Sequence, residues 1–269
     1  MTAGPRRICL RLAYEGTRYS GWQAQPGRAT VQGTVAAAIG SISGEEVALR
    51  GTSRTDAGVH ALDQVAAFTT AADLDAATWA RALNARLPED IAVREACETA
   101  IGFDPVAAAV RKRYRYRVHD AAWRPVFQRR FVWRWRGRLD CGRMRDAAAH
   151  LVGEHDFTSF ESTPSTRLSK VRTIHELSVT RPPLESDAAG AETWIEVEGN
   201  GFLYNMVRII AGSLVMVGAG RREPGWLAAA LAAHSRPEAG PTAPPQGLVL
   251  LQTRLDPDPW RRFPSSSAP

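Results

Sequence analysis

Cysteine and lysine are scarce in this sequence. Three of 269 residues are cysteines, and Cys9, Cys97 and Cys141 are scattered without a Cys-x-x-Cys pair. Such spacing fits neither a disulfide framework nor a thiolate metal site, so we expect reduced thiols. The six histidines lack a metal spacing such as His-x-x-x-His, and we predict no metal site. Lys112 and Lys170 are the only lysines, and arginine supplies the remaining positive charge.

The sequence also lacks a long apolar run and a phosphate-binding glycine motif. Its longest apolar stretch, 206–217, contains Arg208 and is shorter than the roughly 20 residues needed to cross a bilayer. Near the start of the chain, Arg11 interrupts the apolar run that a signal peptide requires. Neither Gly-x-x-x-x-Gly-Lys nor Gly-x-Gly-x-x-Gly occurs, which argues against ATP and dinucleotide chemistry. We therefore expect a soluble, cytoplasmic protein.

Positive charge is concentrated in one segment. Residues 111–145 hold thirteen Lys or Arg and two acids, whereas the whole chain has a formal net charge of +6, so the remainder is net acidic. A polyanion is expected to meet this region, because clustered charge on an otherwise acidic chain is an electrostatic footprint. A solvated charged face is an equally good interpretation of composition alone.

Hydrophobic periodicity predicts a chain of mixed strands and helices. In the first half, alternation over 8–14 and 64–69 predicts strands, and Thr30 and Asp75 can cap helices over 31–39 and 76–87. In the second half we expect strands at 113–118, 131–135 and 194–197, and helices at 140–152 and 205–217. We place one α/β half at 1–105, a second at 106–256, and a disordered tail at 257–269. A weak echo of 15–19 in 198–202 suggests duplicated halves.

The densest group of reactive side chains lies in the polar turn Ser53–His60. Ala57 and Gly58 would let a ligand approach closely beside Asp56, which could then act as a catalytic carboxylate. The competing interpretation is a surface Asx-turn in which Asp56 only caps Gly58 or Val59, and local pattern alone favours it.

Arg208 is the one charged residue in an otherwise apolar helix. A buried guanidinium is strongly unfavourable without an anionic partner. That partner could be a carboxylate such as Asp56, a structural salt bridge, or a phosphate of a substrate.

A third feature is the strand over 113–118, where arginines alternate with Tyr114, Tyr116 and Val118. Guanidinium groups can hold a phosphate backbone while a tyrosine ring supports an unstacked base. Alternatively, this is an amphipathic strand whose tyrosines belong to the core.

Taken together, these segments resemble the tRNA pseudouridine synthase A family from about Arg7 to Leu255. The matching segments are Tyr14–Gly16, Gly21–Gln23, Ser53–Ala61, Leu83–Ala85, Lys112–Tyr116, Asp156–Phe160, Gly199–Phe202, Met206–Arg208 and Gly247–Leu248. The resemblance implies an α/β (α+β) pseudouridine synthase fold, with two similar halves around a central basic cleft. Each half would hold a mostly antiparallel sheet flanked by helices, and the chain would form a homodimer.

The resemblance also implies a reaction and a set of site residues. The enzyme would be an isomerase (an intramolecular transferase) that converts uridine to pseudouridine in the anticodon stem-loop of tRNA, without cofactor or metal. Asp56 would be the catalytic aspartate, Arg54 would help displace or replace the extruded base, Tyr114 would stack on the uracil, and Arg208 would pair with Asp56. Whether Asp56 acts covalently at C1′ or through a glycal intermediate stays open.

The sequence departs from the family pattern in several places. Residues 103–107 lack the family's usual Phe-His-Ala-Arg-Phe, Ser53 and Asp63 replace frequent glycines, and the segment 161–170 is short. These changes put some tRNA contacts in doubt. Two other functions compete: a non-catalytic tRNA-binding protein, and a nucleoside or glycoside hydrolase, which would need a second catalytic carboxylate.

Overall fold

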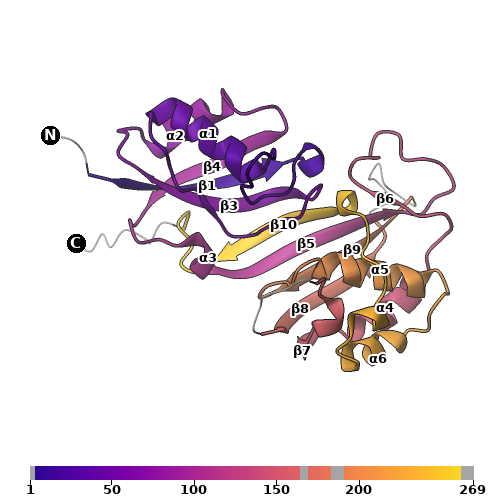
Figure 1. The fold of residues 1–269 in the computed structure, drawn as a ribbon. Coiled ribbons are helices and arrows are strands. Elements are labelled where there is room, and N and C mark those ends of the chain that lie inside the picture. The colour runs from indigo at the N-terminus through magenta and orange to yellow at the C-terminus, as the bar shows by residue number, and fades with distance from the viewer. Residues whose placement is uncertain (1–3, 164–168, 183–190, 262–269) are drawn as a thin grey trace, which may run out of the picture. The chain divides into compact units, whose positions relative to one another are not determined.

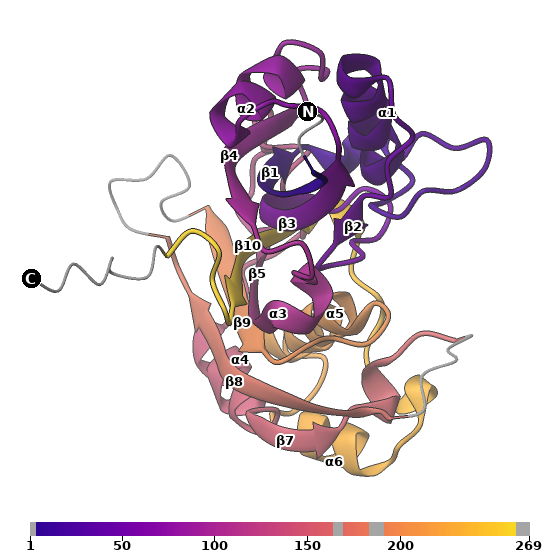
Figure 2. The same ribbon diagram turned by 90° about the vertical axis from the view of Figure 1, so that its left-hand side faces the viewer.

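The computed structural model describes residues 4–163, 169–182 and 191–261. Contacts within the chain divide it into two compact units. Unit 1 takes the described residues of Met1–Val110 and Gln252–Pro269, and unit 2 takes those of Arg111–Leu251. The chain therefore leaves unit 1 once and returns to it near its end, as the colours of Figures 1 and 2 show.

Unit 1 is built on an antiparallel sheet, in which β1 lies between β3 and β4, and β2 pairs with β3. Its strands are β1 (Arg6–Tyr14), β2 (Arg50–Gly51), β3 (His60–Thr70), β4 (Ile91–Thr99) and the second half of β10 (Leu248–Leu255). Its helical elements are η1 (Gly16–Arg18), α1 (Val31–Ser43), α2 (Ala76–Asn84) and α3 (Pro105–Ala108). Helices α1 and α2 contact each other, and α2 packs on β4 (Figure 1).

The predicted caps explain where these helices begin. Thr30 accepts a hydrogen bond from the Gly33 amide, and Asp75 accepts one from the Thr78 amide at 2.6 Å. Trp79 is fully buried and meets Phe68 of β3 edge-on, with ring centroids 5.0 Å apart. The apolar faces thus bind the helices to the sheet.

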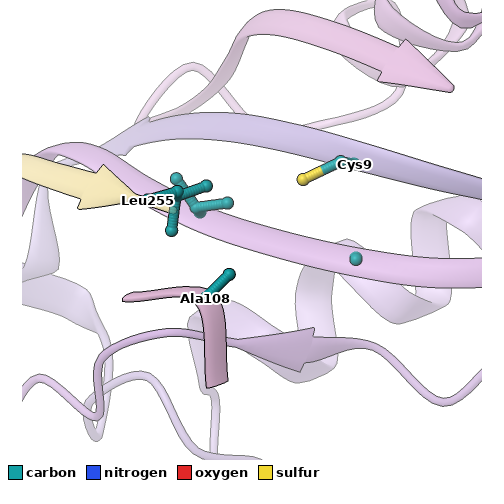
Figure 3. Packing of buried hydrophobic residues seen from close by; sticks show 5 residues of the cluster. Cys9, Ala108 and Leu255 are labelled. Carbon is teal, nitrogen blue, oxygen red and sulfur yellow. The ribbon is translucent and has the colours of Figure 1, made fainter. Parts of the chain in front are cut away.

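One apolar cluster of unit 1 joins residues that are distant in sequence. Figure 3 shows Cys9 of β1, Ala108 and Leu255, which with Val65 and Ala67 of β3 form a buried group. Because Leu255 belongs to β10, the end of the described chain contributes to the core of the unit where the chain began.

Unit 2 is also built on a sheet, with strand order β5-β9-β8-β7, antiparallel throughout except that the short β6 pairs parallel with β5. Its strands are β5 (Ala109–His119, which begins at the unit boundary), β6 (Trp133–Arg134), β7 (Gly153–Asp156), β8 (Val171–Thr180) and β9 (Glu192–Gly199). Its helical elements are α4 (Cys141–Ala149), η2 (Thr158–Phe160), α5 (Met206–Gly218), α6 (Trp226–Ala232), η3 (Arg236–Glu238) and η4 (Pro245–Gly247). Helix α4 packs against α5, α6 and β8 (Figure 2).

The predicted mixed α/β class and mostly antiparallel sheets are confirmed, but some elements differ from expectation. The strand expected at 131–135 is only two residues long, and its Trp133 meets both Trp135 and Tyr116 edge-on. Helix α2 ends before Leu87, since the side chain of Asn84 bonds to both the amide and the carbonyl of Val93. Strands β4, β7, β8 and β10 and helix α6 were not predicted.

The segment expected to be a disordered tail is described as far as Arg261. A guanidinium nitrogen of Arg11 lies 3.9 Å from the Asp258 carboxylate in an ion pair, and the guanidinium carbon of Arg11 lies 4.3 Å from the centroid of the Trp260 ring. Residues 262–269 lie outside the described part of the chain, as do most of the loop expected at 182–191 and half of the short segment 161–170. Among the described residues, no helix is both long and apolar enough to cross a membrane.

Candidate active site

The loop that carries Asp56 joins β2 to β3 and is held by main-chain and side-chain bonds from the first residues of unit 1. The Trp22 amide donates to the Thr55 carbonyl at 3.0 Å, and the Tyr14 hydroxyl bonds to Thr55 Oγ1 at 2.7 Å. Thr55 is buried, whereas Arg54 before it is exposed and Asp56 after it is half-buried. The buried threonine therefore anchors the loop and leaves its two charged neighbours at the rim.

Close approach to this loop requires glycine at position 21. Gly21 has a φ of +92°, and a Cβ atom there would lie 2.6 Å from the Thr55 carbonyl oxygen. Any other residue would push the loop away from its anchor. The sequence motif Gly21–Gln23 therefore helps to position the loop that carries Asp56.

Gln64 supports the same loop from β3 and was not singled out from the sequence. It is fully buried, accepts from the Thr52 hydroxyl and the Ser53 amide, and donates to the Ser53 carbonyl. A buried amide with all these bonds made is a rigid support. The sequence signal for this supporting role was a polar residue within an otherwise apolar strand.

The Asx-turn interpretation of Asp56 is not needed to explain the loop. The Gly58 amide donates to the Tyr19 carbonyl, and the Val59 amide donates to the main-chain carbonyl of Asp56 itself. Both amides that the carboxylate was expected to cap therefore have main-chain acceptors.

Tyr114 and Tyr116 occupy the apolar face of β5 in unit 2. Tyr116 is fully buried, donates to the Pro244 carbonyl at 2.7 Å, and belongs to the core; burial raises its pKa well above the ordinary value, so the hydroxyl stays protonated. Tyr114 is 8% exposed and meets Phe202 edge-on at 5.3 Å. Tyr116 therefore matches the alternative of a core tyrosine, and Tyr114 remains the candidate for base stacking.

Arg208 lies in the first turn of α5 and is oriented by neutral oxygens. Its Nε donates to the Ala243 carbonyl at 2.8 Å, and one terminal nitrogen donates to the side-chain oxygen of Asn205 at 2.7 Å. Asn205 precedes the helix with a left-handed φ of 61°, which aims its side chain back along the helix. These bonds orient the guanidinium at the start of α5. The pairing of Arg208 with Asp56 stays a prediction.

The arginines of β5 pair with carboxylates within unit 2, which was not predicted from the sequence. These carboxylates belong to β9 and β8: Arg111 and Arg113 pair with Glu198, Arg113 also with Glu176, Arg115 with Glu196, and Arg117 with Glu192. Antiparallel pairing places Arg113 opposite Glu198 and Arg115 opposite Glu196, so the cationic face of β5 meets an acidic face of β9. The sequence signal for this pairing was the recurrence of glutamate at intervals of four and two residues within 192–198.

The pKa of Glu198 shows the strength of this pairing. Burial alone would raise it, but hydrogen bonds and charge from Arg111 and Arg113 outweigh burial, so the pKa lies below its ordinary value. The paired glutamates consequently offset much of the positive charge that the composition of 111–145 indicated for β5. Arg124, Arg129, Arg136 and Arg145, which lie after this strand, are exposed.

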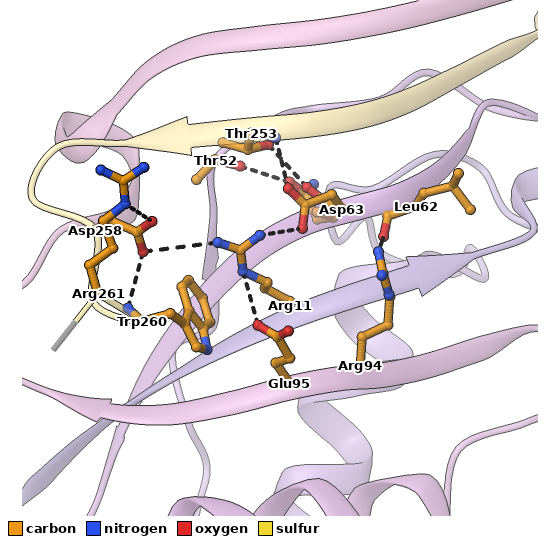
Figure 4. Close-up of polar contacts among 11 residues, drawn as sticks. Arg11, Thr52, Leu62, Asp63, Arg94, Glu95, Thr253, Asp258, Trp260 and Arg261 are labelled. Carbon is orange, nitrogen blue, oxygen red and sulfur yellow. Dashed lines mark hydrogen bonds and ion pairs between the residues drawn. The ribbon is translucent and has the colours of Figure 1, made fainter.

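Two of the departures from the family pattern, at Asp63 and at 103–107, are accommodated within unit 1. Asp63 is buried, and its carboxylate accepts from Arg11 at 3.1 Å and from the Thr253 amide at 2.8 Å (Figure 4). At 103–107, Asp104 caps α3 through the Val106 amide and forms an ion pair with Arg50. Both substituted segments therefore have local structural roles.

No group of three or more His, Cys, Asp or Glu within the described residues is placed to hold a metal ion.

Comparison with known proteins identifies the family. The model of the family described as tRNA pseudouridine synthase matches residues 12–105 and 147–256. The chain belongs to this family. Arg54, Asp56 and Arg208 lie within the matched ranges, whereas Tyr114 and the whole arginine-rich segment 111–145 lie between them.

Relatives named tRNA pseudouridine synthase A align with nearly the whole chain. That of Geotalea uraniireducens (strain Rf4) is 44% identical over 92% of this chain and 98% of its own length. That of Brevibacillus brevis is 44% identical over the same shares, and that of Myxococcus xanthus is 42% identical over 97% of this chain and 96% of the relative. The predicted resemblance to this pseudouridine synthase family is confirmed.

Proposed function

We propose that this chain isomerises uridine to pseudouridine in the anticodon stem-loop of tRNA, with Asp56 as the catalytic carboxylate. The observation that carries the proposal is the half-buried carboxylate on a loop braced by Gly21, Thr55 and Gln64, in a chain of the tRNA pseudouridine synthase family. A braced reactive group suits catalysis, because small displacements of such a group cost rate.

The side chains of the protein can supply every group that the proposed reaction needs. The C1′–N1 bond of uridine breaks, the uracil turns, C1′ bonds to C5, and the C5 proton is lost while N1 gains one. No electron, phosphate or external group is consumed, so no cofactor is required. A carboxylate can serve either as the nucleophile at C1′ or as the base that removes a proton from the ribose.

The target base must leave its helix before this chemistry begins. Unstacking costs a few kcal/mol, which contacts to the extruded nucleotide offset. We assign Arg54, exposed two residues before Asp56, to replacing the base in the helix, and Tyr114 to stacking on the uracil. The edge-on contact with Phe202 fixes the Tyr114 ring, which supports this role.

We assign Arg208 to the Asp56 carboxylate. The Ala243 carbonyl and the Asn205 side chain hold the guanidinium in the first turn of α5. An adjacent cation would keep the carboxylate ionised at neutral pH. The Arg208→Leu variant is expected to lose both stability and turnover, and unchanged values of both would contradict the assignment.

The decisive experiment measures tritium release from tRNA labelled at uridine C5. Asp56→Asn should lower the rate at least about 1000-fold, while tRNA affinity is retained. Asp63→Asn is the matched control, since this buried carboxylate bonds Arg11 and Thr253 and should affect stability but not chemistry. Turnover close to wild type in Asp56→Asn would overturn the proposal.

The products decide between the competing functions. A hydrolase would release free uracil, and a binding protein would release no tritium, whereas the isomerase retains the base as pseudouridine. Mapping the modified residue in tRNA from cells lacking the gene would test the anticodon stem-loop assignment, because the modification should disappear there alone.

We further propose that the chain acts as a homodimer. Large apolar side chains are exposed in one loop of unit 2: Trp123 is 63% exposed, Val126 62% and Phe127 86%. Exposed apolar groups of this size in one segment mark an interaction surface, and a second copy of the chain would cover them. Phe127→Ser should shift the mass measured by light scattering to that of a monomer, and an unchanged mass would exclude this loop as the contact.

A further inference from the structure

Cys9 and Cys97 are distant in sequence but directly opposite each other in the sheet of unit 1. The register of the antiparallel strands β1 and β4 pairs Cys9 with Cys97. Opposite residues of an antiparallel pair have Cα atoms about 4.5 to 5.5 Å apart and project to the same face. A disulfide requires a Cα separation of about 4.4 to 6.8 Å. The backbone therefore holds the two sulfurs within bonding reach.

The two thiols already interact, and their surroundings differ. Each thiol is the largest influence on the pKa of the other. Cys9 is fully buried against Val65, Ala67, Ala108 and Leu255, as Figure 3 shows in part. Cys97 lies at the edge of this cluster and is only half-buried. Cys97 is thus the more exposed of the two cysteines.

Electrostatics favours reaction at the outer sulfur. The neighbouring Cys9 thiol lowers the pKa of Cys97; burial and the charges of Asp258 and Glu95 oppose this shift, and the charge of Arg11 supports it. The Cys97 thiol and burial raise the pKa of Cys9. Arg11 lies on the same face as Cys9, two residues along β1, where it is held by Asp63, Glu95 and the Trp260 ring (Figure 4).

We propose that Cys9 and Cys97 form a reversible dithiol–disulfide site that reacts with hydrogen peroxide. Neither sulfur has a part in the isomerisation, so this site is independent of the proposed function. The Cys97 thiolate attacks one peroxide oxygen, the O–O bond breaks, and the departing hydroxide takes a proton to become water. Cys97 is then a sulfenic acid.

Cys9 then completes the reaction. Its sulfur attacks the Cys97 sulfur, the S–O bond breaks, and the hydroxide leaves as water with the proton of the Cys9 thiol. The two thiols have then given two electrons to peroxide, and two waters and one disulfide result. A small dithiol such as dithiothreitol reverses the change by thiol–disulfide exchange.

The full-length protein provides its own control in Cys141, a half-buried cysteine in unit 2 whose sulfur lies 3.7 Å from the Thr193 hydroxyl and has no cysteine opposite it. Protein treated with peroxide, alkylated, digested and analysed by mass spectrometry should yield a Cys9–Cys97 cross-linked peptide two hydrogens lighter than the free pair. Dithiothreitol should remove the cross-link, and Cys141 should remain alkylated throughout.

Two variants separate the roles of the sulfurs. In Cys9→Ala, Cys97 should be trapped as a sulfenic acid by dimedone; in Cys97→Ser, Cys9 should stay reduced. The proposal is overturned if the wild-type pair remains as alkylatable as Cys141, or if Cys97 proceeds to a sulfinic acid without forming the disulfide. The wild-type result decides even if a variant folds poorly.

Discussion

The side-chain oxygen of Asn205 accepts a 2.7 Å hydrogen bond from Arg208, three residues later on α5. Asn205 also donates to the Ser162 hydroxyl and adopts a left-handed conformation, so its amide bridges a loop and the helix start. It is therefore a positioning residue: it sets the direction of a guanidinium that we assign to the catalytic carboxylate.

The Asn205→Gly variant should keep the backbone conformation and lose the orientation of Arg208. Glycine adopts positive φ without strain, so we expect a small change in unfolding temperature but about a tenfold fall in kcat. An unchanged KM would distinguish a positioning role from a general loss of tRNA binding. Steady-state tritium release measures both constants, and a kcat equal to wild type would refute the positioning role.

Several features of the site were predictable because their causes are local. The turn around Asp56 has its own residue types, and the caps Thr30 and Asp75 act on amides three residues away. The apolar helix around Arg208 was likewise visible as a run interrupted by one charge. The sequence patterns therefore nominated the candidate residues of both units.

The features that were not predictable depend on strand pairing. The sequence around Arg113 does not indicate that Glu198 is its partner. Likewise, the sequence around Asp63 does not indicate Arg11 or Thr253. The register brings these charges together, and a period of two in each strand does not reveal which strand will be its neighbour. The sequence consequently left the arginine-rich strand open between a phosphate contact and an amphipathic strand, and it did not indicate the glutamate partners.

Arg117→Ala should destabilise the protein without weakening tRNA binding much. Arg117 forms two bonds, of 2.8 and 2.9 Å, with Glu192, which is 1% exposed. Removing one partner of a buried pair leaves an uncompensated charge, at a cost of about 3 to 5 kcal/mol in the free energy of unfolding, reduced here because Arg117 is partly exposed.

The matched control for Arg117→Ala is Arg145→Ala, because Arg145 is exposed and its described bond is to the Cys141 carbonyl. Denaturant unfolding and the salt dependence of tRNA affinity should be measured for both variants. If Arg117→Ala left stability intact but reduced the slope of affinity against salt concentration, then the arginines of β5 would be phosphate ligands after all.

Gly21→Ala and Gly27→Ala form a second matched pair. Both glycines have positive φ, at 92° and 70°, so alanine should cost each about 1 to 2 kcal/mol in backbone strain. At Gly27 a Cβ atom meets nothing within 4 Å, whereas at Gly21 it would lie 2.6 Å from the Thr55 carbonyl. Gly21→Ala should therefore lose more stability and, because the Asp56 loop must shift, much of its turnover. Equal activities of the two variants would show that the loop position does not depend on this contact.

Acid should remove the stability that Glu198 contributes. Its pKa in the folded protein lies below the ordinary value of 4.5, so folding favours the ionised carboxylate. This contribution is fully present above about pH 4.5, and it is lost as pH falls through the lower pKa of the folded state. Glu198→Gln should therefore unfold at a lower temperature than wild type at pH 7, and the difference should shrink as the pH approaches 3. Thermal unfolding followed by circular dichroism across this range measures the difference, and a gap between the two proteins that stays constant with pH would mean that the Arg111 and Arg113 pairings do not stabilise the ionised form.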